Sequence, residues 1–382
     1  MAQFDLVFEG GGAKGSAFVG ALTELTKAGH SPRRLVGTSA GAITATLLGA
    51  RYSPDEMLTE VTRTTTDSRG DTLPVFATFM DPPTATSFTK QQLQNSDIME
   101  LLSHIVPNIP FRDRAEQGLL DGLLKLPTVC ELFSLEECSG FYAGDAFLAW
   151  FKQRLANKGL DPAITWDDFA LKTGSDVSVV TSDTRQQERV VLNARTAPKA
   201  PVAESVRMSM SIPFVWRQME WKQEWGTYLN SDRTGHIFVD GGVLSNFPIR
   251  LVEDTDDDTL KIMGKTDPNG AGTIGLLLDE TLPVPGIGDI QTRPPRLKIA
   301  GSILRLVDTM TGASDNEAMR LYTEKICHIP VGGCGTTEFR MPSEKLARLV
   351  QSGADAMHAF LLKHDASAMA AKVTPISMPK VS

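Results

Sequence analysis

Short apolar runs and helical repeats alternate along most of the chain. Six runs have the length and composition of core strands: residues 4–8, 34–36, 177–181, 188–192, 237–239 and 276–279. Between the first two runs, apolar residues recur at helical spacing over residues 16–28, and Gly29 provides a natural helix end. Strand, helix and strand in this order predict a βαβ unit with parallel strands and a right-handed crossover. The pattern therefore predicts an α/β fold.

Two later segments depart from this alternation. Residues 67–140 contain six prolines with apolar patches between them, which predicts an inserted, mostly helical segment. This insertion is interpreted either as a lid or cap over a site or as a helical layer that completes the core. Beyond residue 290, helical periodicity returns at residues 302–310 and 344–362. We expect residues 1–290 to form one domain and residues 291–382 to form a helical extension packed on it.

A glycine-rich loop, Gly10-Gly11-Gly12-Ala13-Lys14-Gly15, separates the first strand from its helix. Its spacing matches the dinucleotide fingerprint, but Gly37-Thr38-Ser39 occupies the place where that fingerprint requires an acidic residue. A P-loop is also excluded, because no Gly-Lys-Ser/Thr follows at the required offset. Bare N–H groups at adjacent glycines beside a helix N-terminus suit the stabilisation of a developing negative charge. The loop is therefore predicted to form an oxyanion hole, with Lys14 adding positive charge or anchoring the loop.

The stretch Gly37-Thr38-Ser39-Ala40-Gly41 lies between the strand at residues 34–36 and a small-residue helix at residues 42–48. G-x-S-x-G in this context is typical of a nucleophile elbow, in which a strained turn holds the serine hydroxyl clear of the backbone. Gly37 and Gly41 fit this role because a Cβ at either position would crowd the turn. Ser39 is the candidate nucleophile, expected opposite the glycine loop at the carboxyl ends of adjacent strands. A turn without chemistry is the alternative, since the motif also recurs by chance.

The strand at residues 237–239 leads into Asp240-Gly241-Gly242. A carboxylate at a strand end, freed by two glycines, can approach the Ser39 hydroxyl and accept its proton. The alternative base is one of six histidines, among which His236 precedes Asp240 by four residues and His328 lies in a run that looks like a strand interior. Neither position suits a triad, whose histidine is expected in a loop after the acid. A dyad of Ser39 and Asp240 would need a partly desolvated Asp240 held against the serine, because an aspartate is a weak base in water.

Composition narrows the classes of function. The 382 residues are 41% hydrophobic with a net charge of −8, which argues against a nucleic-acid polymer as partner. The four cysteines lack C-x-x-C spacing, so we expect buried thiols and no zinc site. The chain shows neither a signal-peptide pattern nor a run of 18 apolar residues. We therefore expect a cytoplasmic protein that contacts membranes peripherally.

Two charged runs are candidates for ion or lipid binding. The acidic run at residues 253–258 lacks the glycine and the terminal glutamate of a calcium-binding loop, so a solvated loop is expected. The basic run at residues 293–298 is interpreted as a plain surface stretch or as a contact for anionic lipid headgroups.

Residues 10–15, 37–41 and 240–242 together resemble, in identity, order and spacing, the patatin-like phospholipase family of bacterial type. The block Ser209-Met210-Ser211-Ile212-Pro213-Phe214 is similar to the one ahead of that family's aspartate. The resemblance covers about residues 4–280 and is weakest at residues 67–140. It implies a three-layer α/β/α fold with a mostly parallel central sheet and an inserted helical lid or cap.

The resemblance also implies a phospholipase A-type acyl hydrolase with a Ser39–Asp240 dyad and no histidine, metal or cofactor. The oxyanion residues that it implies are Gly10, Gly11, Gly12, Lys14 and Gly15. Membrane phospholipids or other acyl esters are the expected partners, with an activating ligand or a homo-oligomer as further options. Some bacterial relatives are antiphage effectors that cyclic nucleotides activate. A ligand-gated membrane-degrading effector or a regulatory lipid-binding module with low basal activity is therefore the alternative.

Overall fold

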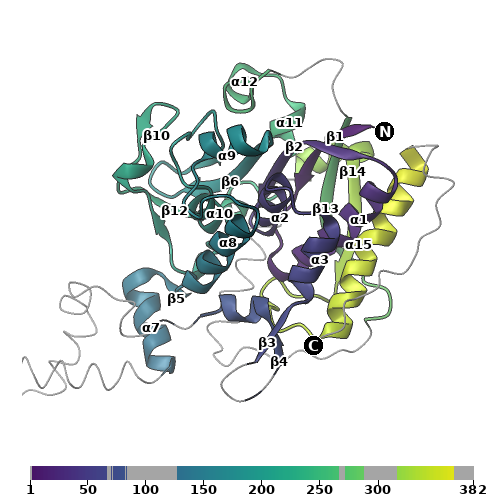
Figure 1. The fold of residues 1–382 in the computed structure, drawn as a ribbon, viewed down its shortest axis with the longest axis horizontal. Helices are drawn as coiled ribbons and strands as arrows, with labels where there is room; N and C mark the ends of the chain where they lie inside the picture. The colour runs from purple at the N-terminus through teal and green to yellow at the C-terminus, as the bar shows by residue number, and fades with distance from the viewer. Residues whose placement is uncertain are drawn as a thin grey trace, which may run out of the picture.

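The computed structural model describes residues 2–66, 70, 72–81, 83, 127–265, 272–287 and 316–364. A central β-sheet with helices on both faces organises these residues (Figure 1). Eight strands within these ranges form the sheet, in the order β14 (Ile326–Gly332), β13 (Gly272–Pro283), β1 (Gln3–Phe8), β2 (Ser31–Thr38), β6 (Asp176–Asp183), β12 (Ile237–Asp240) and β9 (Met219–Glu220), with β7 (Glu188–Leu192) pairing with β6. The α/β fold expected from the sequence is confirmed.

The sheet combines a parallel part with an antiparallel part. β14, β13, β1, β2 and β6 pair with one another in parallel, whereas β7 and β12 are antiparallel to β6, and β9 is antiparallel to β12. The helix α1 (Ala17–Lys27) connects β1 to its parallel neighbour β2, so the predicted βαβ unit is confirmed. The sheet is thus mixed, and its parallel part contains both loops that the sequence singled out.

Two strands, β2 and β12, pair end to end with the same edge of β6. Val180 pairs with Thr38, the last residue of β2, and Thr181 pairs with Asp240, the last residue of β12. β7 pairs with both Val180 and Thr181 and therefore occupies the other edge. β2 and β12 consequently approach each other from opposite directions, and Ser39, which follows Thr38, is brought next to Asp240.

Two apolar cores lie on the two faces of the sheet, and successive residues of β1 alternate between them. Leu6 and Phe8 pack into one core, while Val7 packs into the other. The first core includes residues of α1, α2 (Ala40–Gly49), α3 (Pro54–Thr62), α8 (Asp145–Asn157), α9 (Trp166–Thr173), α10 (Val202–Ser209) and α15 (Ser343–His364). The second core is covered by α11 (Arg250–Glu253), α12 (Asp257–Met263) and α14 (Asn316–Leu321). The expected three-layer arrangement is confirmed.

Shorter elements complete the described part of the chain. Small sheets pair β3 (Thr64–Thr66) with β4 (Thr72–Pro74), β5 (Gly140–Tyr142) with β8 (Phe214–Trp216), and β10 (Thr227–Tyr228) with β11 (Ser231–Asp232). The remaining elements are α7 (Pro127–Cys138) and the 3-10 turns η1 (Gly12–Ser16), η2 (Val75–Phe79), η4 (Gln223–Trp225), η5 (Gly241–Val243) and η6 (Thr323–Lys325). Within these ranges, no helix combines the length and the apolar character needed to cross a membrane.

Several expectations fall outside the described residues. These are most of the insertion at residues 67–140, the basic run at residues 293–298 and the helix expected at residues 302–310. The lid or cap therefore stays a prediction. The helix expected at residues 344–362 is confirmed as α15.

The acidic run at residues 253–258 is not simply a solvated loop. Asp256 caps α12, because its carboxylate accepts the backbone N–H groups of Asp258 at 3.1 Å and Thr259 at 3.0 Å. Aspartate favours both solvated loops and N-caps, so the run of acidic residues alone did not separate the two structures.

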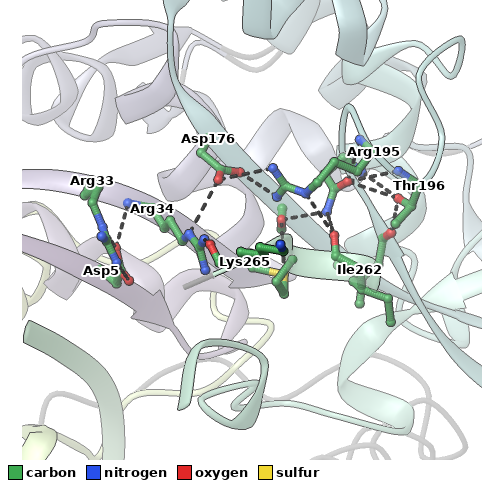
Figure 2. Close-up of polar contacts among 12 residues, drawn as sticks. Asp5, Arg33, Arg34, Asp176, Arg195, Thr196, Ile262 and Lys265 are labelled. Atoms are coloured by element: carbon green, nitrogen blue, oxygen red, sulfur yellow. Dashed lines mark hydrogen bonds and ion pairs between the residues drawn. The ribbon is translucent and has the colours of Figure 1, made fainter. Parts of the chain in front are cut away.

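Charged side chains join three strands at the amino end of the sheet, the end opposite Ser39 (Figure 2). Asp5 of β1 accepts two hydrogen bonds from the Arg33 guanidinium of β2, at 2.8 and 2.6 Å. Arg34 of β2 lies 3.6 Å from the Asp176 carboxylate of β6, which also accepts hydrogen bonds from Arg195 at 2.7 and 3.2 Å. These pairs tie β1, β2 and β6 together and leave the carboxyl ends of the strands to form a site.

Helices α1 and α15 pack closely because glycines occupy their contact. A Cβ on Gly20 would lie 1.8 Å from the backbone oxygen of Val350, and a Cβ on Gly353 would lie 1.9 Å from that of Ala17. Neither glycine can carry a side chain unless the helices separate. Since α1 directly follows the glycine loop, this contact also fixes the position of the loop.

We predict that Gly353→Ala lowers the free energy of unfolding by about 2 kcal/mol, because the added methyl group overpacks the contact. A decrease is informative because helix propensity alone predicts an increase: alanine is more favourable than glycine in a helix interior by about 1 kcal/mol. Urea unfolding measures the change. Gly335→Ala is the control: its Cβ would lie 3.5 Å from its nearest atom, so the change should stay below about 0.5 kcal/mol. A stabilised Gly353→Ala protein would contradict the close packing.

Candidate active site

Ser39 lies in the tight turn between β2 and α2, as its motif predicts. Its backbone has φ of 52° and ψ of −117°, a conformation that is strained for a residue with a Cβ. The flanking glycines are sterically required. A Cβ on Gly37 would lie 2.2 Å from the backbone oxygen of Gly41, and a Cβ on Gly41 would lie 2.4 Å from that of Phe8. The turn thus has the geometry of a nucleophile elbow.

A second serine holds this strained turn in place. The Ser39 N–H donates to Oγ of Ser209 at 2.9 Å, and the Ser209 hydroxyl donates to the backbone oxygen of Val180 at 2.5 Å. Ser209 is fully buried at the end of α10. Its hydroxyl therefore connects the backbone of the elbow to β6.

Asp240 is buried at the end of β12 beside Ser39. Its N–H donates to the backbone oxygen of Ser211 at 2.9 Å, and its Oδ1 accepts the Gly242 N–H at 2.7 Å. Burial raises the pKa of Asp240 to about 7, although hydrogen bonding to the Ser39 hydroxyl and the Gly242 N–H favours the charged form. Oδ2 has no hydrogen bond of regular geometry to any described residue. One carboxylate oxygen is therefore available to a hydroxyl that approaches it.

The glycine loop lies against the elbow, as expected. A Cβ on Gly10 would lie 3.3 Å from Cβ of Ser39, and a Cβ on Gly15 would lie 2.6 Å from Cβ of Ala40. The Gly10 N–H is occupied, because it donates to the backbone oxygen of Asn246 at 3.0 Å. The Lys14 N–H is also occupied, by the backbone oxygen of Gly11 at 3.1 Å.

The N–H groups of Gly11 and Gly12 differ from those of Gly10 and Lys14. Outside the regular helices and strands, neither donates a backbone hydrogen bond to another described residue. Gly12 has φ of 56°, and a Cβ there would lie 2.1 Å from the backbone oxygen of Thr336, so a side chain is excluded on both grounds. Of the five loop residues that the sequence singled out, Gly11 and Gly12 are therefore the candidate donors.

Lys14 anchors the loop to the sheet. Its side chain is buried, and its ammonium group forms an ion pair with Glu280 of β13. Glu9, just before the loop, accepts hydrogen bonds from Nδ2 of Asn246 at 3.1 Å and from the Leu278 N–H at 2.6 Å. The side chains of Lys14 and Glu9 thus hold the loop at both of its ends.

An apolar cavity opens beside Ser39. The glycine loop borders it through Gly12, Ala13 and Gly15. Its walls are mostly apolar side chains, which come from α2 (Ile43, Leu47), α3 (Met57, Val61), η2 (Phe76, Phe79), α8 (Phe147, Trp150), the segment after α10 (Met210, Ile212) and the segment before α15 (Phe339). Glu60 of α3 is the acidic residue in this lining. The cavity is suited to an apolar chain that reaches Ser39.

The two histidines considered as bases pair with other carboxylates. Nδ1 of His236 lies 2.7 Å from Oδ2 of Asp183, and Nδ1 of His328 lies 3.0 Å from Oδ2 of Asp279. Neither histidine lines the cavity. Among the described residues, no group of three or more His, Cys, Asp or Glu side chains could hold a metal ion.

Sequence reasoning singled out the block at residues 209–214 but missed what its members do. Ser209 supports the elbow, and the Ser211 carbonyl accepts the Asp240 N–H. Arg207 is fully buried, and its guanidinium donates to Oγ of Ser211 and to the backbone oxygen of Ala143 at 2.9 Å. The available signal was an alternation of small and apolar residues ahead of a proline, which indicates close packing without identifying the partner.

We predict that Ser209→Ala lowers kcat about tenfold with little change in KM, because the elbow loses a hydrogen bond that holds Ser39. Leaving the buried Ser39 N–H unpaired should also lower the free energy of unfolding by about 1 to 3 kcal/mol. Ester-hydrolysis kinetics and urea unfolding measure the two effects. Ser209→Thr keeps the hydroxyl and should restore most of the rate.

Ser205→Ala is the matched control. Ser205 is a buried serine of the same helix, and its Oγ accepts the Trp166 indole N–H at 2.9 Å without contact to the elbow. It should lose stability but retain kcat. Equal kcat losses in the two alanine variants would show that Ser209 has only a general structural role.

The chain is similar to a bacterial protein and to solved structures of two others. YqhO of Bacillus subtilis (strain 168), an uncharacterized protein, is 25% identical over 367 residues, which span 94% of this chain and 97% of YqhO. Two solved structures are similar with low identity. VipD from Legionella pneumophila has a TM-score of 0.49 at 17% identity, over 95% of this chain and 67% of VipD. ExoU of the Pseudomonas aeruginosa type III secretion system, in complex with SpcU, has a TM-score of 0.41 at 20% identity.

The match to ExoU covers 95% of this chain but only 52% of the ExoU chain, so this chain spans about half the length of that protein.

A family model assigns the chain to a protein family. The model described as Patatin-like phospholipase matches residues 6–252, which is more than half of the chain and includes Ser39, Asp240 and the glycine loop. The chain therefore belongs to the patatin-like phospholipase family.

Proposed function

We propose that the protein is a lipid acyl hydrolase that cleaves fatty-acyl esters of membrane phospholipids with Ser39 and Asp240. The observation that carries this proposal is that Ser39 lines an apolar cavity and lies beside a buried Asp240 whose pKa is about 7. A carboxylate with this pKa is a much better proton acceptor at neutral pH than an ordinary aspartate. The family assignment supports a lipid ester as the substrate.

The proposed first step acylates the enzyme. Oγ of Ser39 attacks the ester carbonyl carbon while its proton passes to Oδ2 of Asp240. The carbonyl oxygen becomes an oxyanion, which the N–H groups of Gly11 and Gly12 stabilise. One such donor contributes about 3 kcal/mol in well-studied oxyanion holes. The ester C–O bond then breaks, and the departing lysophospholipid or alcohol takes the proton from Asp240.

The second step releases the fatty acid. Water attacks the acyl-serine carbonyl and gives its proton to Asp240, and the same N–H groups stabilise the second oxyanion. Collapse of this intermediate breaks the bond to Ser39 Oγ, which recovers the proton from Asp240. No step requires a histidine, and both steps use the same buried carboxylate.

We predict that Ser39→Ala and Asp240→Ala each reduce fatty-acid release from mixed phospholipid vesicles by at least about 1,000-fold, since nucleophile and base act as a unit. Mass spectrometry of the released acids measures the effect and identifies the cleaved lipid. His328→Ala is the control, and it should retain most of the activity. Near-normal release by Asp240→Ala would refute the dyad. Absence of release by the wild type would refute hydrolysis without an activator.

We also predict that kcat/KM rises about tenfold per pH unit below pH 7 and levels off above it. The reason is the sign of the titration: Asp240 accepts a proton only when ionised, and its pKa of about 7 leaves it protonated in acid. Initial rates between pH 5 and pH 9 measure the profile, with circular dichroism at each pH as the control for folding. A constant kcat/KM between pH 5 and pH 8 would exclude Asp240 as the base.

A further inference from the structure

The helices α2 and α8 border the cavity along its length. At the amino end of α8, the Arg207 guanidinium donates to the backbone oxygen of Gly144 at 3.2 Å and to Oγ of Ser211. The backbone oxygen of Ser211 accepts the Asp240 N–H, so Arg207 and Ser211 connect this end of α8 to Asp240. At the carboxyl ends of the two helices, the Tyr52 hydroxyl after α2 donates to the backbone oxygen of Arg154 in α8 at 2.9 Å. The two helices therefore run in the same direction, away from Ser39.

The walls between the two helices are mostly apolar from the reaction centre outward. α2 presents Ala40, Ile43, Thr44 and Leu47 to the cavity, and α8 presents Phe147 and Trp150. The Thr44 hydroxyl donates to the backbone oxygen of Ala40 at 3.0 Å, so its hydrogen bond is made within α2. Ser39 and Leu47 are eight residues apart, so the apolar wall extends about 12 Å at 1.5 Å per helical residue. This length limits how much of a substrate chain the cavity can take in a straight conformation.

An ion pair lies at the far end of this wall. Glu60 of α3 lines the cavity and pairs with Arg154 of α8, one turn beyond Trp150. The two side chains are only 13% and 5% exposed, and Arg63 lies 3.9 Å from the same Glu60 carboxylate. An apolar chain end cannot replace either partner, because separating a buried ion pair leaves an uncompensated charge.

We propose that the Glu60–Arg154 ion pair closes the acyl cavity and sets an upper limit on the length of the acyl chain. An extended chain advances about 1.3 Å per methylene, given a C–C bond of about 1.5 Å. The apolar wall therefore accommodates about nine or ten carbons, so acyl chains of this length should be cleaved faster than the longer chains that are also found in membrane phospholipids. This inference rests on the proposed function, since it concerns the chain attached to the carbonyl that Ser39 attacks.

The test compares kcat/KM across p-nitrophenyl esters with 4 to 16 carbons. For the wild type, kcat/KM should fall at least tenfold between the 10-carbon and the 16-carbon ester. The double variant Glu60→Ala/Arg154→Met removes both charges together and opens the end of the cavity. It should raise the 16-carbon to 4-carbon ratio of kcat/KM at least tenfold. An unchanged ratio in an active double variant would overturn the proposal.

The chain offers a matched control between α3 and α8, the two helices that the Glu60–Arg154 ion pair joins. Glu56 and Lys158 form an ion pair at 2.6 Å between α3 and the end of α8, outside the cavity lining. Glu56→Gln/Lys158→Met should leave the 16-carbon to 4-carbon ratio unchanged; glutamine keeps the capping contact of residue 56 with Ser53. A shift in this control equal to that of the double variant would show that the effect is not specific to Glu60 and Arg154.

Two further results separate the possible failures. If the double variant does not fold, Leu47→Phe narrows the same end of the cavity without altering charge. It should lower the 10-carbon to 4-carbon ratio of kcat/KM at least fivefold, and an unchanged ratio would overturn the proposal.

If the wild type hydrolyses the 4-carbon ester no faster than Ser39→Ala, the proposed function itself fails. Wild-type hydrolysis with equal kcat/KM at all lengths would refute the length limit alone.

Discussion

The register of β6 is the constraint on which the rest of the site depends. Val180 and Thr181 are consecutive residues, yet they pair with the ends of two different strands, β2 and β12. Because neither strand can extend further along this edge, each turns away at once, one into the elbow at Ser39 and the other into η5. The turn after β12 has no room for a side chain, since a Cβ on Gly241 would lie 2.3 Å from the backbone oxygen of Val180. The juxtaposition of Ser39 and Asp240 is thus a consequence of strand pairing.

The same junction determines the charge state of Asp240. Two strand ends and the end of α10 bury its carboxyl group, and burial raises its pKa from 3.8 to about 7. The folded state therefore binds this proton more tightly than the unfolded chain does. The resulting stabilisation is complete below about pH 4 and is lost as the pH rises to about 7. At neutral pH the fold thus holds a carboxylate whose charged form burial disfavours, and the proposed reaction would use that property.

Local sequence patterns predicted much of this arrangement. The elbow, the glycine loop and the strand before Asp240 are each encoded within a few residues, and all three occur where they were expected. The direction of β12 was not predictable, because a three-residue apolar run carries no information about its partner. Ser209 was missed for a similar reason: it accepts the N–H of a residue 170 positions away. Likewise, the hydrogen bond of Gly10 to the Asn246 carbonyl links residues that no local pattern relates.

The glycine loop also depends on residues beyond the family match, which ends at residue 252. The backbone oxygen of Thr336 accepts the Ala13 N–H at 2.9 Å, Glu280 pairs with Lys14, and Phe339 lines the cavity. Strand β14, which precedes Thr336, in turn completes the edge of the sheet beside β13. One side of the loop therefore faces the elbow, and the other rests on the last third of the chain. The position of the Gly11 and Gly12 N–H groups therefore depends on contacts beyond the family match as well as on the elbow.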